Sequence, residues 1–436
     1  MAGPFAELGP LEPLMDACVH CGFCLPTCPS YLLLGQEMDS PRGRIYLMRA
    51  GVEERIDMAP AVVEHFDTCL GCMACETACP SGVRYAPLLE QTRASIERGH
   101  TRPAGERWMR RLLFAVLPFP RRLRLLAVPL ALADVFRRWP ALLSRLPPRM
   151  RAAISLAPTV TLADALRETP EHTAAKGAPR LRVGLVTGCV QRAFFGGVNR
   201  ATARVLSAEG CEVVAPRSQG CCGALALHAG EDGDAREFAR DLIARFDRAD
   251  VDVVAVNAAG CGSAMKEYGH LLRHDPPWAE RAKTFAAKVK DVTEVLAGLD
   301  PPRAPRRSMP LRVAYHDACH LAHAQGIRRE PRQLLASIPD LTVRPITESE
   351  ICCGSAGIFN LVQPEMAATL GRRKAGHIHD ADPDLVVTSN PGCMLQLQAA
   401  ARERGEKYRV VHIVELLDAA FAEAPPADRS KMKSGS

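Results

Sequence analysis

The chain has 436 residues, of which 47% are hydrophobic and 24% charged, enough for two to four domains that each bury a core. This composition excludes an intrinsically disordered chain and a collagen-like one. The formal net charge is +6, but residues 101–151 hold 12 arginines and two acidic residues, a local +10 that leaves −4 for the remainder. A uniformly basic binding protein would not show this pattern, so we expect no nucleic acid among the partners.

The chain begins with MAGPFAELGPLEPLMD, which has neither the basic nor the apolar part of a secretory signal. We therefore expect a cytoplasmic protein, in a reducing compartment where its 17 cysteines act as metal ligands rather than as disulfides. No mainly apolar run reaches the roughly 18–20 residues that a membrane span needs. Any membrane contact is expected to be peripheral.

Composition divides the chain into five parts, which predict a multidomain protein. A cysteine-rich domain comes first, followed by a helical connector rich in arginine and proline, two repeated α/β copies and a disordered tail. The predicted parts are residues 1–100, 101–180, 181–300, 311–424 and 425–436.

Two cysteine runs in residues 1–100 share one spacing. Each has three cysteines two residues apart and a fourth after three more residues, followed directly by proline. This is the spacing of bacterial ferredoxins with two 4Fe-4S clusters, in which the fourth cysteine of each run ligates the other cluster. We therefore predict two cluster sites, one formed by Cys18, Cys21, Cys24 and Cys79 and the other by Cys69, Cys72, Cys75 and Cys28.

A structural zinc site is the alternative for any two cysteines two residues apart. Zinc takes four ligands, whereas four cysteines fall within eleven residues twice here, which favours clusters. Complete thiolate sets leave no vacancy for His20 or His65, which we expect at the surface or behind the ligands. We expect Arg42, Arg44 and Arg84 to face water, with contact to the anionic surroundings of the clusters as the alternative.

Forty residues separate Cys28 from Cys69, too many for a minimal ferredoxin hairpin. They include the stretch SPRGRIYLMRAGVEER, which predicts a helix that begins near Ser40 and Pro41. The N-terminal domain is therefore predicted to be a helical two-cluster domain.

Residues 181–424 contain one pattern twice. Runs of β-branched apolar residues that end in a small residue and a cysteine predict buried parallel strands, and a Cys-Cys-Gly lies in the middle of each copy. These strands are expected within residues 181–189, 251–261, 311–319 and 384–393. The cysteine separations agree to one residue between the copies, which indicates an internal duplication. Helical segments between the strands make each copy an α/β unit.

The cysteines of these copies follow strands, where parallel sheets place ligands. Gly223 and Gly354, after the paired cysteines, allow a close approach of the backbone. The leftover Cys211 is expected to be a small buried residue. Each copy could hold one more iron-sulfur cluster, on Cys189, Cys221, Cys222 and Cys261 in the first copy and on Cys319, Cys352, Cys353 and Cys393 in the second.

Two alternatives remain for the repeated cysteines. They could be ordinary core residues, although a paired motif at matched spacing disfavours that interpretation. The other alternative is that His316 activates Cys319 as a reactive thiolate. It ranks lower, because the first copy has Thr187 and Gly188 before Cys189 and lacks such a base.

The arginine-rich stretch of residues 101–151 alternates basic clusters with short apolar runs cut by prolines. Two interpretations fit this pattern about equally well. It could dock on a membrane surface or a partner, or it could be a partly helical connector that packs on its own neighbours.

Two segments of the N-terminal domain have the sequences CVHCGFCLPTCPSYLLLGQEMDSPRGRIYLMR and DTCLGCMACETACPSGVRYAPLLE. These segments, together with the two Cys-Cys-Gly (CCG) domains that follow them, resemble the iron-sulfur subunits of bacterial glycolate oxidase. The resemblance covers nearly the whole chain. The wider family is similar in layout and includes iron-sulfur subunits of anaerobic glycerol-3-phosphate dehydrogenase, lactate-utilisation proteins and the CCG subunit of heterodisulfide reductase.

One departure bears on the mechanism. The heterodisulfide-reductase type ends each CCG copy with two cysteines two residues apart, whereas Gly-Ser-Ala follows Cys261 and Met-Leu-Gln follows Cys393. Each set has one thiolate fewer, which argues against noncubane clusters and disulfide reduction. An ordinary four-thiolate cluster still fits one or both copies.

The resemblance implies a non-catalytic electron-transfer subunit. A separate FAD-bearing subunit would oxidise glycolate to glyoxylate, and this chain would pass the electrons toward a quinone at the cytoplasmic face of the inner membrane. The chain shows no Rossmann-type glycine fingerprint of its own, which fits this division. An iron-sulfur subunit for lactate or glycerol 3-phosphate oxidation, and a CCG-type heterodisulfide reductase, are the alternatives.

Overall fold

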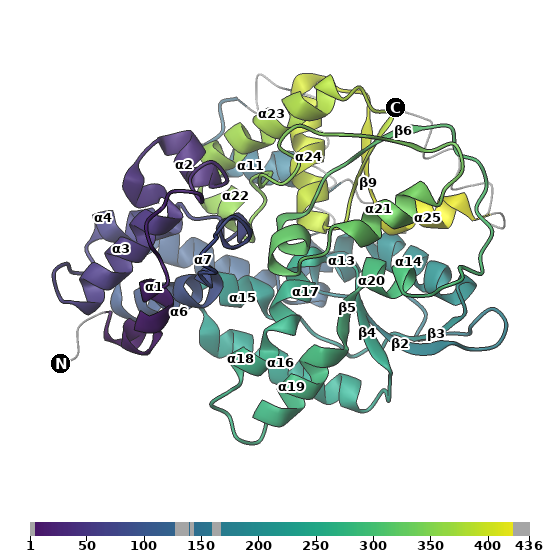
Figure 1. Ribbon diagram of the computed structural model, residues 1–436, viewed down its shortest axis with the longest axis horizontal. Coiled ribbons are helices and arrows are strands. Elements are labelled where there is room, and N and C mark those ends of the chain that lie inside the picture. Colours follow the sequence, from purple (N-terminus) through teal and green to yellow (C-terminus); the bar gives the residue numbers. More distant parts are fainter. Residues whose placement is uncertain (1–4, 127–138, 140–143, 159–166, 422–436) are drawn as a thin grey trace.

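The computed structural model describes residues 5–126, 139, 144–158 and 167–421. A helical N-terminal domain lies at one end of the molecule, and two α/β units lie one above the other beside it (Figure 1). The predicted tail, residues 425–436, and parts of the predicted connector lie outside the described residues. Among the described helices, none is long and apolar enough to cross a membrane.

The N-terminal domain consists of short helices joined by the cysteine-bearing loops. The predicted helix after Ser40 is confirmed, because Ser40 caps it by accepting a 3.0 Å hydrogen bond from the Gly43 amide, and Pro41 occupies its first turn. The elements are η1 (Ala6–Leu11), α1 (Glu12–Asp16), α2 (Pro29–Leu34), η2 (Glu37–Asp39), α3 (Pro41–Val52), α4 (Pro60–Asp67), α5 (Ala74–Thr77) and α6 (Tyr85–Gly99).

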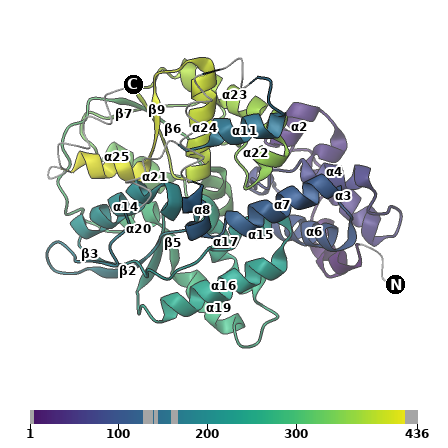
Figure 2. The same cartoon turned by 180° about the vertical axis from the view of Figure 1, so that it is seen from behind.

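The described part of the connector contains α7 (Ala104–Val116), α8 (Pro120–Leu125) and α11 (Pro148–Leu156). Figure 2 shows α7 and α8 leading from the N-terminal helices toward the α/β units. α8 packs on α13 (Val190–Phe194) of the first copy, and α11 packs on α22 (Phe359–Val362) and α24 (Pro391–Arg404) of the second. These two helices therefore follow the interpretation in which the connector packs on its own neighbours.

The first copy is a five-stranded sheet in the order β1-β3-β2-β4-β5, parallel except for β1 at its edge. β1 comes from residues that we assigned to the connector, so the sheet begins before the predicted boundary at 181. The elements are β1 (His172–Thr173), β2 (Leu181–Val186), α13 (Val190–Phe194), α14 (Gly196–Ala208), β3 (Cys211–Val214), α15 (Ala224–Ala229), α16 (Asp232–Asp247), β4 (Val253–Val256), α17 (Ala259–Lys266), α18 (Tyr268–Leu271), α19 (Ala279–Lys288), β5 (Val289–Asp291) and α20 (Val292–Ala297).

The second copy is a four-stranded parallel sheet in the order β7-β6-β8-β9. This order matches β3-β2-β4-β5, as the predicted duplication requires. The elements are β6 (Arg312–Tyr315), η3 (His320–Ala324), α21 (Arg329–Ala336), β7 (Thr342–Arg344), α22 (Phe359–Val362), α23 (Pro364–Asp380), β8 (Leu385–Thr388), α24 (Pro391–Arg404), β9 (Arg409–His412) and α25 (Ile413–Ala420).

The two copies share one hydrophobic core. A single apolar cluster contains strand residues of both sheets, and α14 packs on α25 while α20 packs on α21. Arg204 of α14 also donates a 3.0 Å hydrogen bond to Asp418 of α25. β4 and β8 are buried along their whole length, as strands covered on both faces must be. The loops after the strands of both copies are thereby fixed relative to each other.

Candidate metal centres

The first cysteine run lies in a loop that leads into α2. Cys21 is exposed, Cys18 and Cys24 are half-buried, and Cys28 is buried at the cap of α2. The Cys28 Sγ lies 3.3 Å from Ser30 Oγ and 3.7 Å from the Asp39 carbonyl oxygen. The run therefore extends from the surface to the interior of the domain.

The second run surrounds α5, and its thiols meet backbone N–H donors. The Gly71 amide donates to Cys69 Sγ at 3.4 Å, and the Val83 amide donates to Cys79 Sγ at the same distance. Gly71 has φ +63°, so its backbone turns toward the sulfur in a conformation that side-chain-bearing residues rarely adopt. Such N–H donors suit sulfur that carries negative charge.

The fold brings Cys28 of the first run close to the second run. Burial raises the pKa of Cys72 and Cys75, and the neighbouring Cys28 thiol is among the groups that raise both further. Cys28 is thus close enough to interact electrostatically with thiols that lie more than forty residues later. The predicted division of the eight cysteines between two clusters remains a prediction, and this proximity agrees with it.

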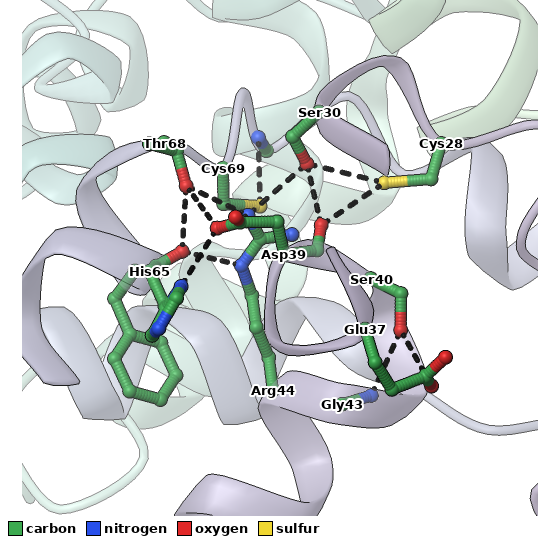
Figure 3. Close-up of polar contacts among 12 residues, drawn as sticks. Cys28, Ser30, Glu37, Asp39, Ser40, Gly43, Arg44, His65, Thr68 and Cys69 are labelled. Atoms are coloured by element: carbon green, nitrogen blue, oxygen red, sulfur yellow. Dashed lines mark hydrogen bonds and ion pairs between the residues drawn. The ribbon is translucent and has the colours of Figure 1, made fainter. Parts of the chain in front are cut away.

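Arg44 lies buried between the two runs (Figure 3). Its Nε donates to the His65 carbonyl oxygen at 2.5 Å, and its Nη2 donates to Ser30 Oγ and Thr68 Oγ1, each at 3.0 Å. The same Nη2 lies 3.6 Å from Asp39 Oδ1, and Nη1 is buried without a hydrogen-bond partner in the part of the chain that the structure describes. A positive charge with a free donor is therefore held between Ser30, two residues after Cys28, and Thr68, one residue before Cys69.

The expectation that Arg44 faces water is wrong. α3 turns it inward, because its charge is balanced by Asp39 and its donors meet groups from three separate segments. Arg84 is exposed, as expected. Arg42 is half-buried; it pairs with Glu37 at 2.6 Å and donates to the His20 carbonyl oxygen at 2.8 Å.

Arg93 of α6 supplies a second positive charge, which no sequence pattern indicated. Its Nη2 donates to the Cys69 carbonyl oxygen at 2.5 Å. Burial raises the pKa of Cys69, but the charges of Arg44 and Arg93, together with hydrogen bonds from the Gly71 amide and the Tyr85 hydroxyl, hold that pKa below its usual value. The position of Arg93 in the amphipathic pattern of its helix does not indicate that it contacts Cys69.

In the first copy, all four predicted cysteines come together. Cys189 and Cys221 lie 3.5 Å apart between Sγ atoms, and Cys222 interacts with both Cys221 and Cys261. The Gly223 amide donates to Cys221 Sγ at 3.4 Å. A Cβ at Gly223 would come within 3.0 Å of the Ala235 carbonyl oxygen, so the residue after the pair has no room for a side chain.

The second copy also gathers its four cysteines. Cys319 and Cys352 lie 3.9 Å apart between Sγ atoms, Cys353 interacts with Cys352 and Cys393, and Asn390 Nδ2 donates to Cys393 Sγ at 3.4 Å. A packing role alone does not explain two such convergent sets. Cys211 has no part in either; it is fully buried in β3, and burial raises its pKa to about 11.

His316 joins the second set in a way that the sequence analysis did not expect. One nitrogen of its ring, the Sγ atom of Cys353 and the Sγ atom of Cys393 all lie within 4.8 Å of one another. The group is therefore centred on Cys353 and Cys393, not on the pair His316–Cys319 that an activated thiolate would need. Burial and the nearby Lys374 charge lower the pKa of His316 to about 3, so the ring is neutral.

The second cysteine run lies directly against the second copy. Leu70, Cys72 and Ala74 share an apolar cluster with Cys352 and Phe359, and Cys319 packs on it. The His320 ring donates from Nε2 to the Gly71 carbonyl oxygen at 3.0 Å, and Thr77 Oγ1 lies 2.5 Å from His323 Nδ1. The cysteine sites therefore adjoin one another from the N-terminal domain into the second copy.

Comparison with known proteins agrees with this layout. The model of a 4Fe-4S dicluster domain matches residues 14–83, and that of a cysteine-rich CCG domain matches residues 183–266 and 313–398. The "Probable glycolate oxidase iron-sulfur subunit" of Bacillus subtilis (strain 168) is 39% identical over 412 residues, 92% of each chain. The chain belongs to the family of glycolate oxidase iron-sulfur subunits.

Other relatives extend the comparison. The "Glycolate oxidase iron-sulfur subunit" of Escherichia coli (strain K12) is 35% identical over 94% of this chain and 95% of its own length. "Lactate utilization protein A" of Geobacillus thermodenitrificans (strain NG80-2) is 31% identical over 238 residues, which are 55% of this chain and 99% of that protein. Of these three relatives, the two glycolate oxidase subunits match along nearly the whole chain, whereas lactate utilization protein A matches about half of it.

The residues of this family member fit iron-sulfur clusters on chemical grounds. Thiolates are the usual ligands of such clusters. The four cysteines of each CCG copy lie together, Cys28 lies near the second run, and all of these thiols are free. The amides of Gly71 and Gly223 donate to cysteine sulfurs, and the charge of Arg44 helps to lower the pKa of the Cys69 thiol. Zinc would not need this additional positive charge.

Proposed function

We propose that this chain is the electron-carrying subunit of a complex that oxidises glycolate to glyoxylate, and that the oxidation itself takes place on a partner. The observation that carries the proposal is the contact between the second cysteine run and the second CCG copy, together with the closeness of Cys28 of the first run to Cys72 and Cys75. Glycolate oxidation releases two electrons, and a bound iron-sulfur cluster takes up and releases one electron at a time.

We assign the ligands as the cysteine pattern predicts. Cys18, Cys21, Cys24 and Cys79 would hold one 4Fe-4S cluster and Cys69, Cys72, Cys75 and Cys28 the other, with a further cluster on the four cysteines of each CCG copy. In this arrangement Arg44 and Arg93 place positive charge beside the second site. Positive charge favours the reduced, more negative state, so these residues help that site to accept an electron.

The flavin partner docks where the first run reaches the surface. Val19 and Phe23 flank Cys21, and their side chains are 67% and 65% exposed. Two exposed apolar side chains beside a cluster ligand are typical of a protein-protein contact. We therefore assign this face to the FAD-bearing subunit, so that electrons enter at the first site.

The electrons leave toward a quinone, and α7 holds the chain at the membrane surface that contains it. Trp108 and Leu112, one turn apart, are 68% and 47% exposed, and Arg107 and Arg111 lie exposed beside them. An amphipathic face with Trp, Leu and arginines suits an anionic bilayer surface. This contact would place the protein on the cytoplasmic side of the inner membrane.

An anaerobic pull-down of the tagged chain from its own host tests the assignment of partner and substrate. We expect bound flavin, and dye reduction with glycolate in preference to D-lactate, L-lactate and glycerol 3-phosphate. Phe23→Ser should lower the amount of flavin recovered at unchanged iron content. The likeness to lactate utilization protein A gives the second candidate, and preference for a lactate isomer would decide for it. Recovery without flavin but with disulfide reduction would contradict both.

A further inference from the structure

We propose that the imidazole of His316 is a nitrogen ligand of the iron-sulfur centre in the second CCG copy, so that the two copies hold chemically different centres. The inference rests on the proposed function, because it takes an iron-sulfur centre in that copy as given.

His316 directly follows the last residue of β6. Its amide donates to the Val387 carbonyl oxygen at 2.8 Å, which extends the pairing of β6 with β8 by one residue. His316 thus stands at the carboxyl end of β6, three residues before Cys319 and at the edge where parallel sheets bind ligands. The backbone therefore fixes the position of this residue independently of any metal.

The ring of His316 makes no hydrogen bond to any described residue. Its side chain is 1% exposed, and neither Nδ1 nor Nε2 has a hydrogen-bond partner among the described residues. A buried imidazole with two unmet nitrogens costs free energy unless a ligand satisfies one of them. The sulfurs of Cys353 and Cys393, also buried, complete a group in which all three donor atoms lie within 4.8 Å.

The two copies differ at this position. Val186 occupies the position of His316 in the first copy, where it pairs in register with Val256. In the second copy the corresponding neighbours are His316 and Thr388, and Thr388 Oγ1 is likewise buried without a hydrogen-bond partner among residues with a described position. Two valines of the first copy are therefore replaced in the second copy by two polar side chains, and the second copy shares an apolar cluster with the second cysteine run.

The consequence is an asymmetry in redox behaviour. Replacing a thiolate by a neutral imidazole removes negative charge from a centre and raises its reduction potential. Four thiols and one imidazole give five donors, one more than a four-iron cubane requires, so one thiol of the second copy becomes dispensable. The second copy then holds the higher-potential centre, next to Cys72 of the second run.

Pulsed EPR of the reduced, full-length chain in its complex tests the inference. Protein grown with 15N-histidine should show a hyperfine coupling from a directly bound nitrogen, shifted from its 14N frequency. His316→Ala should lose the coupling, and His316→Cys should lose it while keeping the wild-type iron content and lowering the potential of that centre. The matched control is His377→Ala in the same copy, whose ring already bonds Glu348 at 3.1 Å.

Three results would overturn the inference: wild-type protein without a bound-nitrogen coupling, a coupling that survives in His316→Cys, or a second copy that carries zinc or no metal. Each leaves the signals of the N-terminal clusters and their reduction by glycolate intact. Failure of the proposed function gives a different pattern, because glycolate would then not reduce the N-terminal clusters even where the nitrogen coupling is present.

Discussion

Arg44 and Asp39 form a buried ion pair between the two cysteine runs, with 3.6 Å between Nη2 and Oδ1 and almost no exposure of either side chain. Asp39 Oδ1 also accepts from Thr68 Oγ1 at 2.8 Å and lies 2.9 Å from His65 Nδ1. The pair therefore joins η2, α3 and the end of α4 at the point where both cysteine runs reach the interior (Figure 3).

Arg44→Met should destabilise the protein strongly. Removing one partner of a buried ion pair leaves the other charge unpaired, which typically costs ~3–5 kcal/mol. We expect a lower urea midpoint under anaerobic conditions and loss of iron from the N-terminal domain. Arg42→Met is the matched control on the same helix, because a partly exposed pair contributes at most ~1 kcal/mol. Equal midpoints for both variants would contradict the role of Arg44.

The crossed assignment of ligands predicts which cysteine variants behave alike. Cys28→Ser should perturb the same EPR signal as Cys69→Ser, and Cys79→Ser the same signal as Cys18→Ser. Cys211→Ala, in the core of the first copy, should leave every cluster signal and the iron content unchanged. If Cys28→Ser instead resembled Cys18→Ser, each run would ligate its own cluster.

Gly354→Ala should damage the second CCG copy. Gly354 has φ +93°, and a Cβ there would lie 2.6 Å from the Ala367 carbonyl oxygen. Strain in this region of backbone space costs on the order of 1–3 kcal/mol before the clash is counted. Gly376→Ala is the control, since α23 leaves space at that position and a helical Gly→Ala change stabilises by ~0.5–1 kcal/mol. Wild-type stability and iron content in Gly354→Ala would refute this prediction.

Asp291 should make the first copy less stable as the pH rises. Burial raises the pKa of Asp291 from 3.8 to about 6, and its Oδ2 has no hydrogen-bond partner within the described residues. Because the folded state binds this proton more tightly than the unfolded state, stability is greatest below the unfolded pKa and is lost as the pH rises through about 6.

Asp291→Asn keeps the cap on α20, where Oδ1 accepts from the Thr293 amide at 2.8 Å, and removes the titration. At pH 7.5 the variant should exceed the wild type by up to ~3 kcal/mol in urea unfolding, and the gain should shrink toward pH 5. Asp57→Asn, at an exposed position, is the control. A gain that is the same at both pH values would exclude the titration as its cause.

The sequence predicted the parts of this protein whose signals are local. The cysteine spacing, the cap at Ser40 and the repeated strand pattern depend on neighbours in the chain, and the helical and α/β units appear where these signals lie. Arg44 could not be placed in this way, because its partners Ser30, Asp39 and Thr68 come from separate segments.

For the same reason, the sequence did not indicate that His316 lies beside Cys353 and Cys393, or that the second cysteine run packs on the second copy. Nothing near His316 in the chain indicates that Cys353 and Cys393 meet it, since they follow it by more than thirty residues. The contact of Gly71 with His320 spans 249 residues and depends on how whole domains pack. Long-range packing of this kind is not encoded in spacing or periodicity.

The most direct test of the electron-carrying role is rapid anaerobic mixing of glycolate with the purified complex while the visible absorbance of the oxidised clusters is followed. We predict bleaching in the complex at a rate that depends on the flavin subunit, slower and incomplete bleaching with Cys72→Ser, and none when this chain is mixed with glycolate alone. Reduction of the isolated chain by glycolate, or a reduced flavin beside clusters that stay oxidised, would contradict the account.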